Sequence, residues 1–138
     1  LLDMGIRSYF LSAALLGITA QRLVRRLCPV CREEYEIPAE SPEAVFLDDK
    51  NHQGLTAFRA NGCDKCRGTG YQGRLAIHEL LTFSEGIQTA IMAGEKMKAI
   101  ETEAIREGMI PLRCDGIEKA LAGKTTLEEI KRGLYGDV

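Results

Sequence analysis

Four of the five cysteines occur in two Cys-x-x-Cys pairs, Cys28–Cys31 and Cys63–Cys66. Two cysteines three positions apart in a tight turn can both point at one ion. Two such pairs supply four thiolates, which is the closed tetrahedral shell of a structural zinc site. The sequence therefore predicts that Cys28, Cys31, Cys63 and Cys66 bind one Zn²⁺.

The residues around these pairs favour a thiolate site. Gly68 and Gly70 follow the second pair and allow the backbone to fold close to the sulfurs, where N–H groups stabilise thiolate charge. One Zn²⁺ and four thiolates carry a net charge of −2. We expect nearby basic side chains to offset this charge. They are Arg25, Arg26, Arg32, Lys65 and Arg67.

Three alternatives use the same four residues. They are a pair of redox disulfides, an iron–sulfur cluster and unligated cysteines. The shell has no position for water or histidine, so zinc bound here would be structural. Its binding could contribute roughly 10–16 kcal/mol to folding. Chelation is expected to unfold residues 28–73 before the helical part of the chain.

No other motif predicts chemistry. Cys114 is expected to be a small buried residue on a helix face, His78 a structural residue of a strand, and His52 a solvated turn residue. The run Gly123-Lys124-Thr125 resembles the end of a phosphate-binding P-loop, but Glu118 stands where that motif needs glycine. We assign no catalytic residue.

The apolar pattern predicts the elements that position the cysteines. Residues 7–16 are expected to form a buried helix. The stretches 21–28 and 74–82 are expected to pair as antiparallel strands whose ends meet at the metal site. Between them, Ser41-Pro42 predicts a short helix to about Asp48, and residues 55–59 a short strand.

After Thr82 the pattern is helical. We expect four short helices, the first capped by Ser84, the third opened by Pro111, and the fourth capped by a Thr126–Glu129 capping box. The predicted fold class is α+β: a small antiparallel sheet with a zinc-stapled insertion, followed by a C-terminal bundle of about four short helices. Residues 1–27 and 74–138 would form the main body, and residues 28–73 the insertion.

Composition excludes several classes of function. The 138 residues carry a formal charge of −2, no Trp and 6% aromatic residues, which argues against a nucleic-acid partner. The longest apolar stretch, residues 9–20, is too short for a transmembrane helix. An odd cysteine count with no signal-peptide pattern does not suggest a secreted disulfide scaffold. Because the chain begins with Leu1, we expect it to be a piece of a longer protein.

Three segments resemble the C-terminal part of the type II secretion and type IV pilus assembly ATPases. They are LLDMGIRSYFLSAALLGITAQRLVRRLCPVC, GCDKCRGTGYQGRLAIHELL and GMIPLRCDGIEKALAGKTTLEEIKR. The resemblance implies that the four cysteines form a zinc-binding insertion of that domain. It also implies that ATP and Mg²⁺ are bound only by upstream parts of the parent chain.

The same resemblance implies the setting of the parent protein. It would be a cytoplasmic hexameric motor, peripheral to the inner membrane, whose partners are neighbouring subunits of a homo-hexamer and the inner-membrane platform proteins of secretion or pilus assembly. Whether the parent serves secretion, pilus assembly or DNA uptake is left open.

A rival class is a stand-alone zinc-knuckle module that binds nucleic acid or unfolded clients. CDKCRGTG matches the Cys-x-x-Cys-x-Gly-x-Gly repeat of J-domain co-chaperones, but CPVCREEY lacks the glycines. A basic cluster could contact a neighbouring subunit or a membrane-embedded partner. We favour a solvated strand face that also offsets thiolate charge. The cluster comprises Arg22, Arg25, Arg26 and Arg74.

Overall fold

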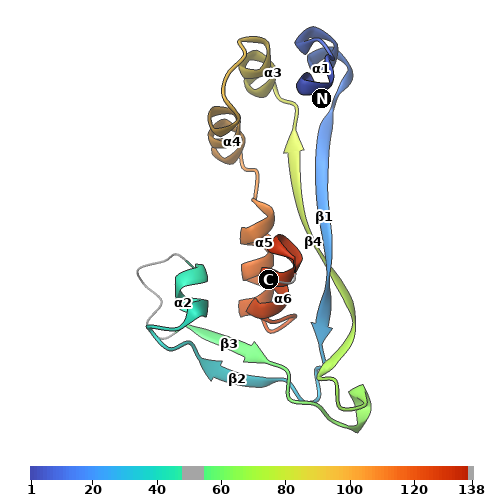
Figure 1. Cartoon of the computed structure of the whole chain (residues 1–138), viewed down its shortest axis with the longest axis vertical. Coiled ribbons are helices and arrows are strands. Elements are labelled where there is room, and N and C mark those ends of the chain that lie inside the picture. The colour runs from blue at the N-terminus through green and yellow to red at the C-terminus, as the bar shows by residue number, and fades with distance from the viewer. Residues whose placement is uncertain (48–54, 137–138) are drawn as a thin grey trace. The chain divides into compact units, whose positions relative to one another are not determined.

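The computed structural model describes residues 1–47 and 55–136 and has the predicted α+β class. In chain order the elements are η1 (Leu2–Met4), α1 (Ser8–Ala14), β1 (Gly17–Leu27), β2 (Glu33–Glu36), α2 (Pro42–Leu47), β3 (Thr56–Arg59), η2 (Asp64–Cys66), β4 (Tyr71–Thr82), α3 (Glu85–Met92), α4 (Met97–Arg106), α5 (Leu112–Leu121) and α6 (Leu127–Tyr135) (Figure 1). No helix of the described residues is long and apolar enough to cross a membrane.

Strands β1 and β4 form the predicted antiparallel pair. Beyond one end of the pair, Cys28 N–H donates to the Gly70 carbonyl at 2.9 Å. Beyond the other, Phe83 N–H donates to the Leu16 carbonyl at 2.9 Å. Both strands are longer than the sequence indicates. The first helix accordingly ends at Ala14, because Leu15 is already extended.

The prediction that this first helix is buried is wrong. Only Leu11 and Ser12 of α1 are buried, whereas Tyr9 is 63% and Phe10 58% exposed. A seven-residue helix has two turns, and α1 uses one face of them to pack on α3. The described chain leaves the other apolar face uncovered.

Strands β2 and β3 form a second antiparallel sheet between the cysteine pairs. Glu33 lies opposite Arg59, which binds its carboxylate through two nitrogens at 2.9 and 3.2 Å. The sequence predicts β3 and misses β2. The predicted start of α2 is confirmed, since Ala44 N–H donates to Ser41 Oγ at 3.1 Å. Its predicted end at Asp48, like His52, lies outside the described residues.

The chain divides by contacts into two units, each with its own core. Unit 1 comprises residues 1–20 and 79–111, and its core is formed by Phe83, Ile87, Ile91 and Ala104. Unit 2 comprises residues 21–78 and 112–138, and its core is formed by Val24, Ile37, Ala44, Phe46, Leu47, Ala57, Ile77, Ala120, Leu127 and Ile130. Residues between the cysteine pairs thus share one core with α5 and α6. The insertion boundaries at residues 28 and 73 remain a prediction.

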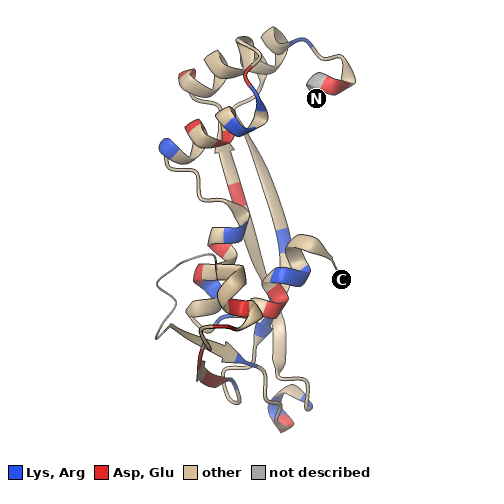
Figure 2. Ribbon diagram, turned by 60° about the vertical axis from the view of Figure 1, so that its left-hand side comes forward, with Lys and Arg blue, Asp and Glu red and all other residues tan. Residues whose placement is uncertain are grey.

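The four predicted C-terminal helices are present as two packed pairs, α3 with α4 and α5 with α6. Ser84 caps α3, accepting from Ile87 N–H at 3.1 Å. Thr126 caps α6 as predicted, accepting from Glu129 N–H at 3.1 Å. Figure 2 shows that α5 and α6 both carry charged residues of both signs.

The second half of the predicted capping box is wrong. The Glu129 side chain is 1% exposed, and instead of reaching back it binds Arg25 of β1. One carboxylate oxygen accepts from Arg25 N–H at 2.9 Å and the other from its guanidinium at 2.6 Å. Arg132 adds an ion pair at 2.8 Å. Two cationic donors bind a carboxylate more strongly than one neutral amide does.

The Arg25–Glu129 pair makes the stability of unit 2 depend on pH. Burial raises the pKa of Glu129, but the hydrogen bonds from Arg25 outweigh it, so the pKa lies below its usual value. A carboxylate with a lowered folded-state pKa stabilises the fold fully above its unfolded pKa of about 4.3. That stabilisation is lost as the pH falls through the folded pKa.

We predict that Glu129→Gln lowers the free energy of unfolding by about 1–3 kcal/mol at pH 7, since a charge-assisted hydrogen bond is lost from a buried site. The difference from the unsubstituted chain should shrink below about pH 4. Urea unfolding across pH measures both effects. Glu118→Gln, on the exposed side of α5, is the control. An equal loss in the two variants would contradict the prediction.

Candidate metal centre

The four predicted cysteines come together, with their Sγ atoms all within 4.8 Å of one another. The Sγ–Sγ distance is 3.9 Å for Cys28–Cys63, 3.7 Å for Cys31–Cys66 and 3.8 Å for Cys63–Cys66. Cys28 directly follows β1, and Cys66 ends η2, which precedes β4. The antiparallel pairing of β1 with β4 therefore brings the two cysteine pairs to one place.

These distances fit one tetrahedral ion. A tetrahedron with metal–sulfur bonds of about 2.3 Å has sulfur–sulfur edges of about 3.8 Å. A disulfide needs its sulfurs about 2.05 Å apart. A polynuclear iron–sulfur cluster holds its cysteines on different irons, which spreads the sulfurs further. The observed spacing therefore fits a single-ion site better than a disulfide or a polynuclear cluster.

Hydrogen bonds within the backbone shape both turns. In the first, Arg32 N–H donates to the Cys28 carbonyl at 3.1 Å. In the second, the N–H groups of Cys66 and Gly68 both donate to the Cys63 carbonyl, at 3.2 and 2.9 Å. Arg67 between them is left-handed, with φ of 55°. Each turn thereby directs its two sulfurs to the same side.

Position 70 requires glycine because the backbone there passes close to Ala60. Its φ is +75°, and a Cβ there would lie 2.5 Å from Ala60 Cβ. Its N–H donates to Cys66 Sγ at 3.1 Å, as the sequence predicts for a glycine after the second pair. A side chain at this position would push the donor away from the sulfur.

Two backbone donors stabilise the thiolate form of Cys66. Burial raises the pKa of its thiol, but the N–H groups of Cys63 and Gly70, each 3.1 Å from Sγ, lower it to about 6 overall. Burial raises the pKa of Cys31 to about 12. Because like charges repel, four thiolates this close together require a central cation.

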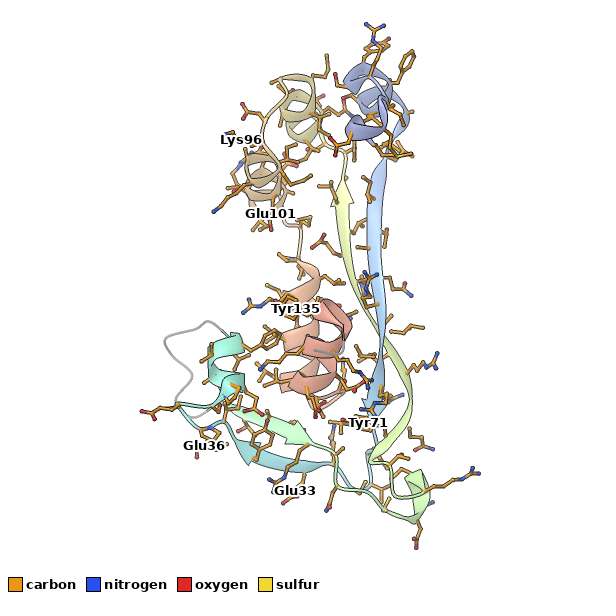
Figure 3. All side chains as sticks on the ribbon, viewed as in Figure 1. Glu33, Glu36, Tyr71, Lys96, Glu101 and Tyr135 are labelled. Atoms are coloured by element: carbon orange, nitrogen blue, oxygen red, sulfur yellow. The ribbon has the colours of Figure 1, made fainter. Side chains whose placement is uncertain are left out.

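Two of the cations expected to offset the thiolate charge have other partners. Arg25 binds Glu129, and its guanidinium carbon lies 4.1 Å from the centre of the Tyr71 ring. Arg32 donates to the Gly123 carbonyl at 2.6 Å. Figure 3 shows Tyr71 at the start of β4, on the side of α6. All four arginines of the predicted basic cluster are exposed: Arg22, Arg25, Arg26 and Arg74.

Cys114 and His78 lie outside the group of four cysteines. Cys114 is exposed, contrary to prediction, because α5 turns Gly116 and Ala120 inward. The backbone N–H of His78 donates to the Asp115 carboxylate at 2.9 Å, and its Nδ1 lies 3.8 Å from the same oxygen, but the side chain is 57% exposed, so a structural role for the imidazole stays a prediction.

Sequence reasoning missed the link between Arg25 and Glu129. Its partners are far apart along the chain, and Glu129 fits a local capping pattern equally well. The sequence does contain a pattern from which strand β2 could have been predicted. Tyr35 and Ile37 alternate with glutamates, which is the period of a half-buried strand.

We predict that Gly70→Ala prevents high-affinity binding of Co²⁺, a tetrahedral probe whose thiolate complexes absorb visible light. Gly73→Ala is the matched control, because Gly73 has φ of +76° but nothing within 4 Å of its Cβ position. Both variants place a side chain at a left-handed backbone position, which costs about 1–2 kcal/mol of stability. Only the first should weaken the cobalt spectrum. Equal cobalt spectra for the two variants would show that the contact between position 70 and Ala60 does not affect metal binding.

Known proteins match almost the whole chain. The family described as Type II/IV secretion system protein matches residues 1–132. The type IV pilus assembly ATPase PilB of Thermus thermophilus is 45% identical over 128 residues, which cover 93% of this chain and 14% of that protein. The type II secretion system protein E of Dickeya dadantii is 45% identical over 130 residues, covering 94% of this chain and 25% of that protein.

A third relative is the type II secretion system ATPase E of Vibrio cholerae, which is 43% identical over 130 residues. The chain thus spans a quarter or less of the length of these relatives. The family match covers nearly every residue, including both cysteine pairs, the helices α3, α4 and α5, and the first part of α6. The chain belongs to the type II/IV secretion system protein family.

Proposed function

We propose that this chain is the C-terminal, zinc-binding, non-catalytic portion of a cytoplasmic hexameric ATPase that powers type II secretion or type IV pilus assembly. The observation that carries the proposal is the tetrahedral spacing of four cysteine sulfurs in a chain of this family. Relatives named for both machines match it equally well, so the proposal keeps both.

Zinc is the ion that this donor set favours. Soft thiolates in a tetrahedral S₄ arrangement select Zn²⁺ over hard cations such as Mg²⁺ or Ca²⁺. Cys28, Cys31, Cys63 and Cys66 would fill the coordination shell and leave no open position for a water molecule. The role is therefore structural: the site joins the end of β1 to the start of β4 and closes the segment between them.

Nucleotide chemistry is assigned to other parts of the whole protein. This sequence contains no Gly-x-x-x-x-Gly-Lys-Ser/Thr motif. The segment most similar to that motif is Gly123–Thr125, and it makes hydrogen bonds within the chain. The Gly123 carbonyl accepts from Arg32, and the Thr125 hydroxyl donates to the Arg25 carbonyl. ATP and Mg²⁺ would be bound by upstream parts of the whole protein.

The partners proposed are neighbouring subunits of a homo-hexamer and inner-membrane platform proteins, in a machine peripheral to the inner membrane. Support comes from the names of the relatives and from apolar side chains that the chain leaves exposed. Exposed apolar groups close together in sequence are typical of surfaces covered in an assembly. In the first 18 residues they are Leu1, Met4, Ile6, Tyr9, Phe10, Leu16 and Ile18.

We predict one zinc per chain by metal analysis. Chelation should increase amide exchange in residues 28–73, as the sequence suggests, and also in α5 and α6, because these helices share the core of unit 2. Exchange in α3 and α4 should change less, since their core is separate. A folded chain free of zinc would contradict the proposed metal. Equal changes in α3 and α6 would contradict the shared-core argument.

The whole protein tests the motor proposal. We predict that it is a hexamer by native mass, hydrolyses ATP, and loses zinc and thermal stability when Cys63 is replaced by Ser, because three thiolates remain. Cys114→Ser is the matched control, since this cysteine is exposed and lies outside the cluster. A monomeric protein without ATPase activity that binds nucleic acid or unfolded clients would favour the rival class.

A further inference from the structure

The turn between α5 and α6, Gly123–Thr126, contacts the segments on both sides of the first cysteine pair. The Arg32 side chain, next to Cys31, donates to the Gly123 carbonyl at 2.6 Å. Leu27, which directly precedes Cys28, donates its N–H to the Lys124 carbonyl at 3.0 Å. The α5–α6 turn therefore holds the chain both before and after this pair.

The second half of the turn contacts chain beside both cysteine pairs. The Thr125 hydroxyl donates to the Arg25 carbonyl at 2.7 Å. Thr126 Oγ1 lies 3.3 Å from the Tyr71 hydroxyl, within hydrogen-bond distance. Tyr71 directly follows Gly70, the residue whose N–H donates to Cys66 Sγ. All four residues of the α5–α6 turn thus contact chain that flanks the cysteines.

The α5–α6 turn has little room to move. Thr125 is fully buried. Gly123 has φ of +69°, and a Cβ there would lie 2.8 Å from Arg32 Nη1 and 3.0 Å from the Phe58 ring. Arg32 is itself fixed between this carbonyl and the Phe58 ring, whose centre is 5.0 Å from its guanidinium carbon. In a close-packed region, displacement of one partner displaces the others.

We propose that the α5–α6 turn is a positioning element of the metal centre. It holds the flanks of both cysteine pairs at the spacing that one ion needs, so that metal binding and order in the turn are coupled. This inference rests on the proposed metal binding. Coupling is reciprocal: the factor by which the intact turn tightens metal binding is the factor by which bound metal stabilises the turn.

The test replaces Thr125, a positioning residue, by Val, which keeps the shape and removes the hydroxyl. Zinc affinity is measured by competition with a chromophoric chelator. We expect the zinc Kd to rise about 2- to 10-fold, the effect of one hydrogen bond. Thr125→Ser should restore it. The matched control is Ile77→Val, a buried change in the same core, which should lower Tm similarly and leave the Kd within about twofold.

Amide exchange of the unsubstituted chain gives a second measurement. Adding Zn²⁺ to the metal-free chain should slow exchange at Gly123, Lys124 and Glu129, whose N–H groups bond within or beside the turn. The slowing should exceed that in the middle of α5, around Asp115. Uniform slowing along α5 and the turn would overturn the inference.

The outcomes separate this inference from the proposed function. If the unsubstituted chain binds no zinc, the proposed metal site is wrong and the inference is overturned with it. If that chain binds zinc and Thr125→Val binds it as tightly, only the inference is overturned. Equal weakening by Thr125→Val and Ile77→Val would also overturn it, because the turn would then act through general stability alone.

Discussion

The close approach of four cysteine sulfurs is the constraint on which the rest of this structure depends. Sulfurs less than 5 Å apart cannot all ionise without a cation among them. The chain brings them together from two distant segments, using strand pairing and two tight turns. The backbone donors at Cys66 lower the pKa of its thiol, whereas burial raises the pKa of Cys31.

A second electrostatic contact joins the ends of unit 2. Glu129 is buried on α6 and bound by Arg25, three residues before Cys28. A buried carboxylate without its cation is strongly destabilising, so this pair specifies how α6 lies against β1. Arg25 also stacks on Tyr71 of β4. One arginine therefore connects both strands that lead to the cysteines with the last helix.

Local signals predicted local features of this protein. Cys-x-x-Cys spacing identified the four cysteines that lie together, and Ser41, Ser84 and Thr126 marked helix starts, because turns and caps depend on a few neighbouring residues. Features set by distant partners were missed. The position of the Glu129 side chain depends on Arg25, and the exposure of Cys114 depends on how α5 packs on α6. The core of unit 2 combines segments that no short window contains.

The long sequence separation within unit 2 has a consequence for synthesis. Val24 and Ile130 belong to one core, so this core cannot close while the chain is still being translated through α5. The first cysteine pair leaves the ribosome long before Glu129 is available to Arg25. During that interval its thiols are open to oxidation and to adventitious metals.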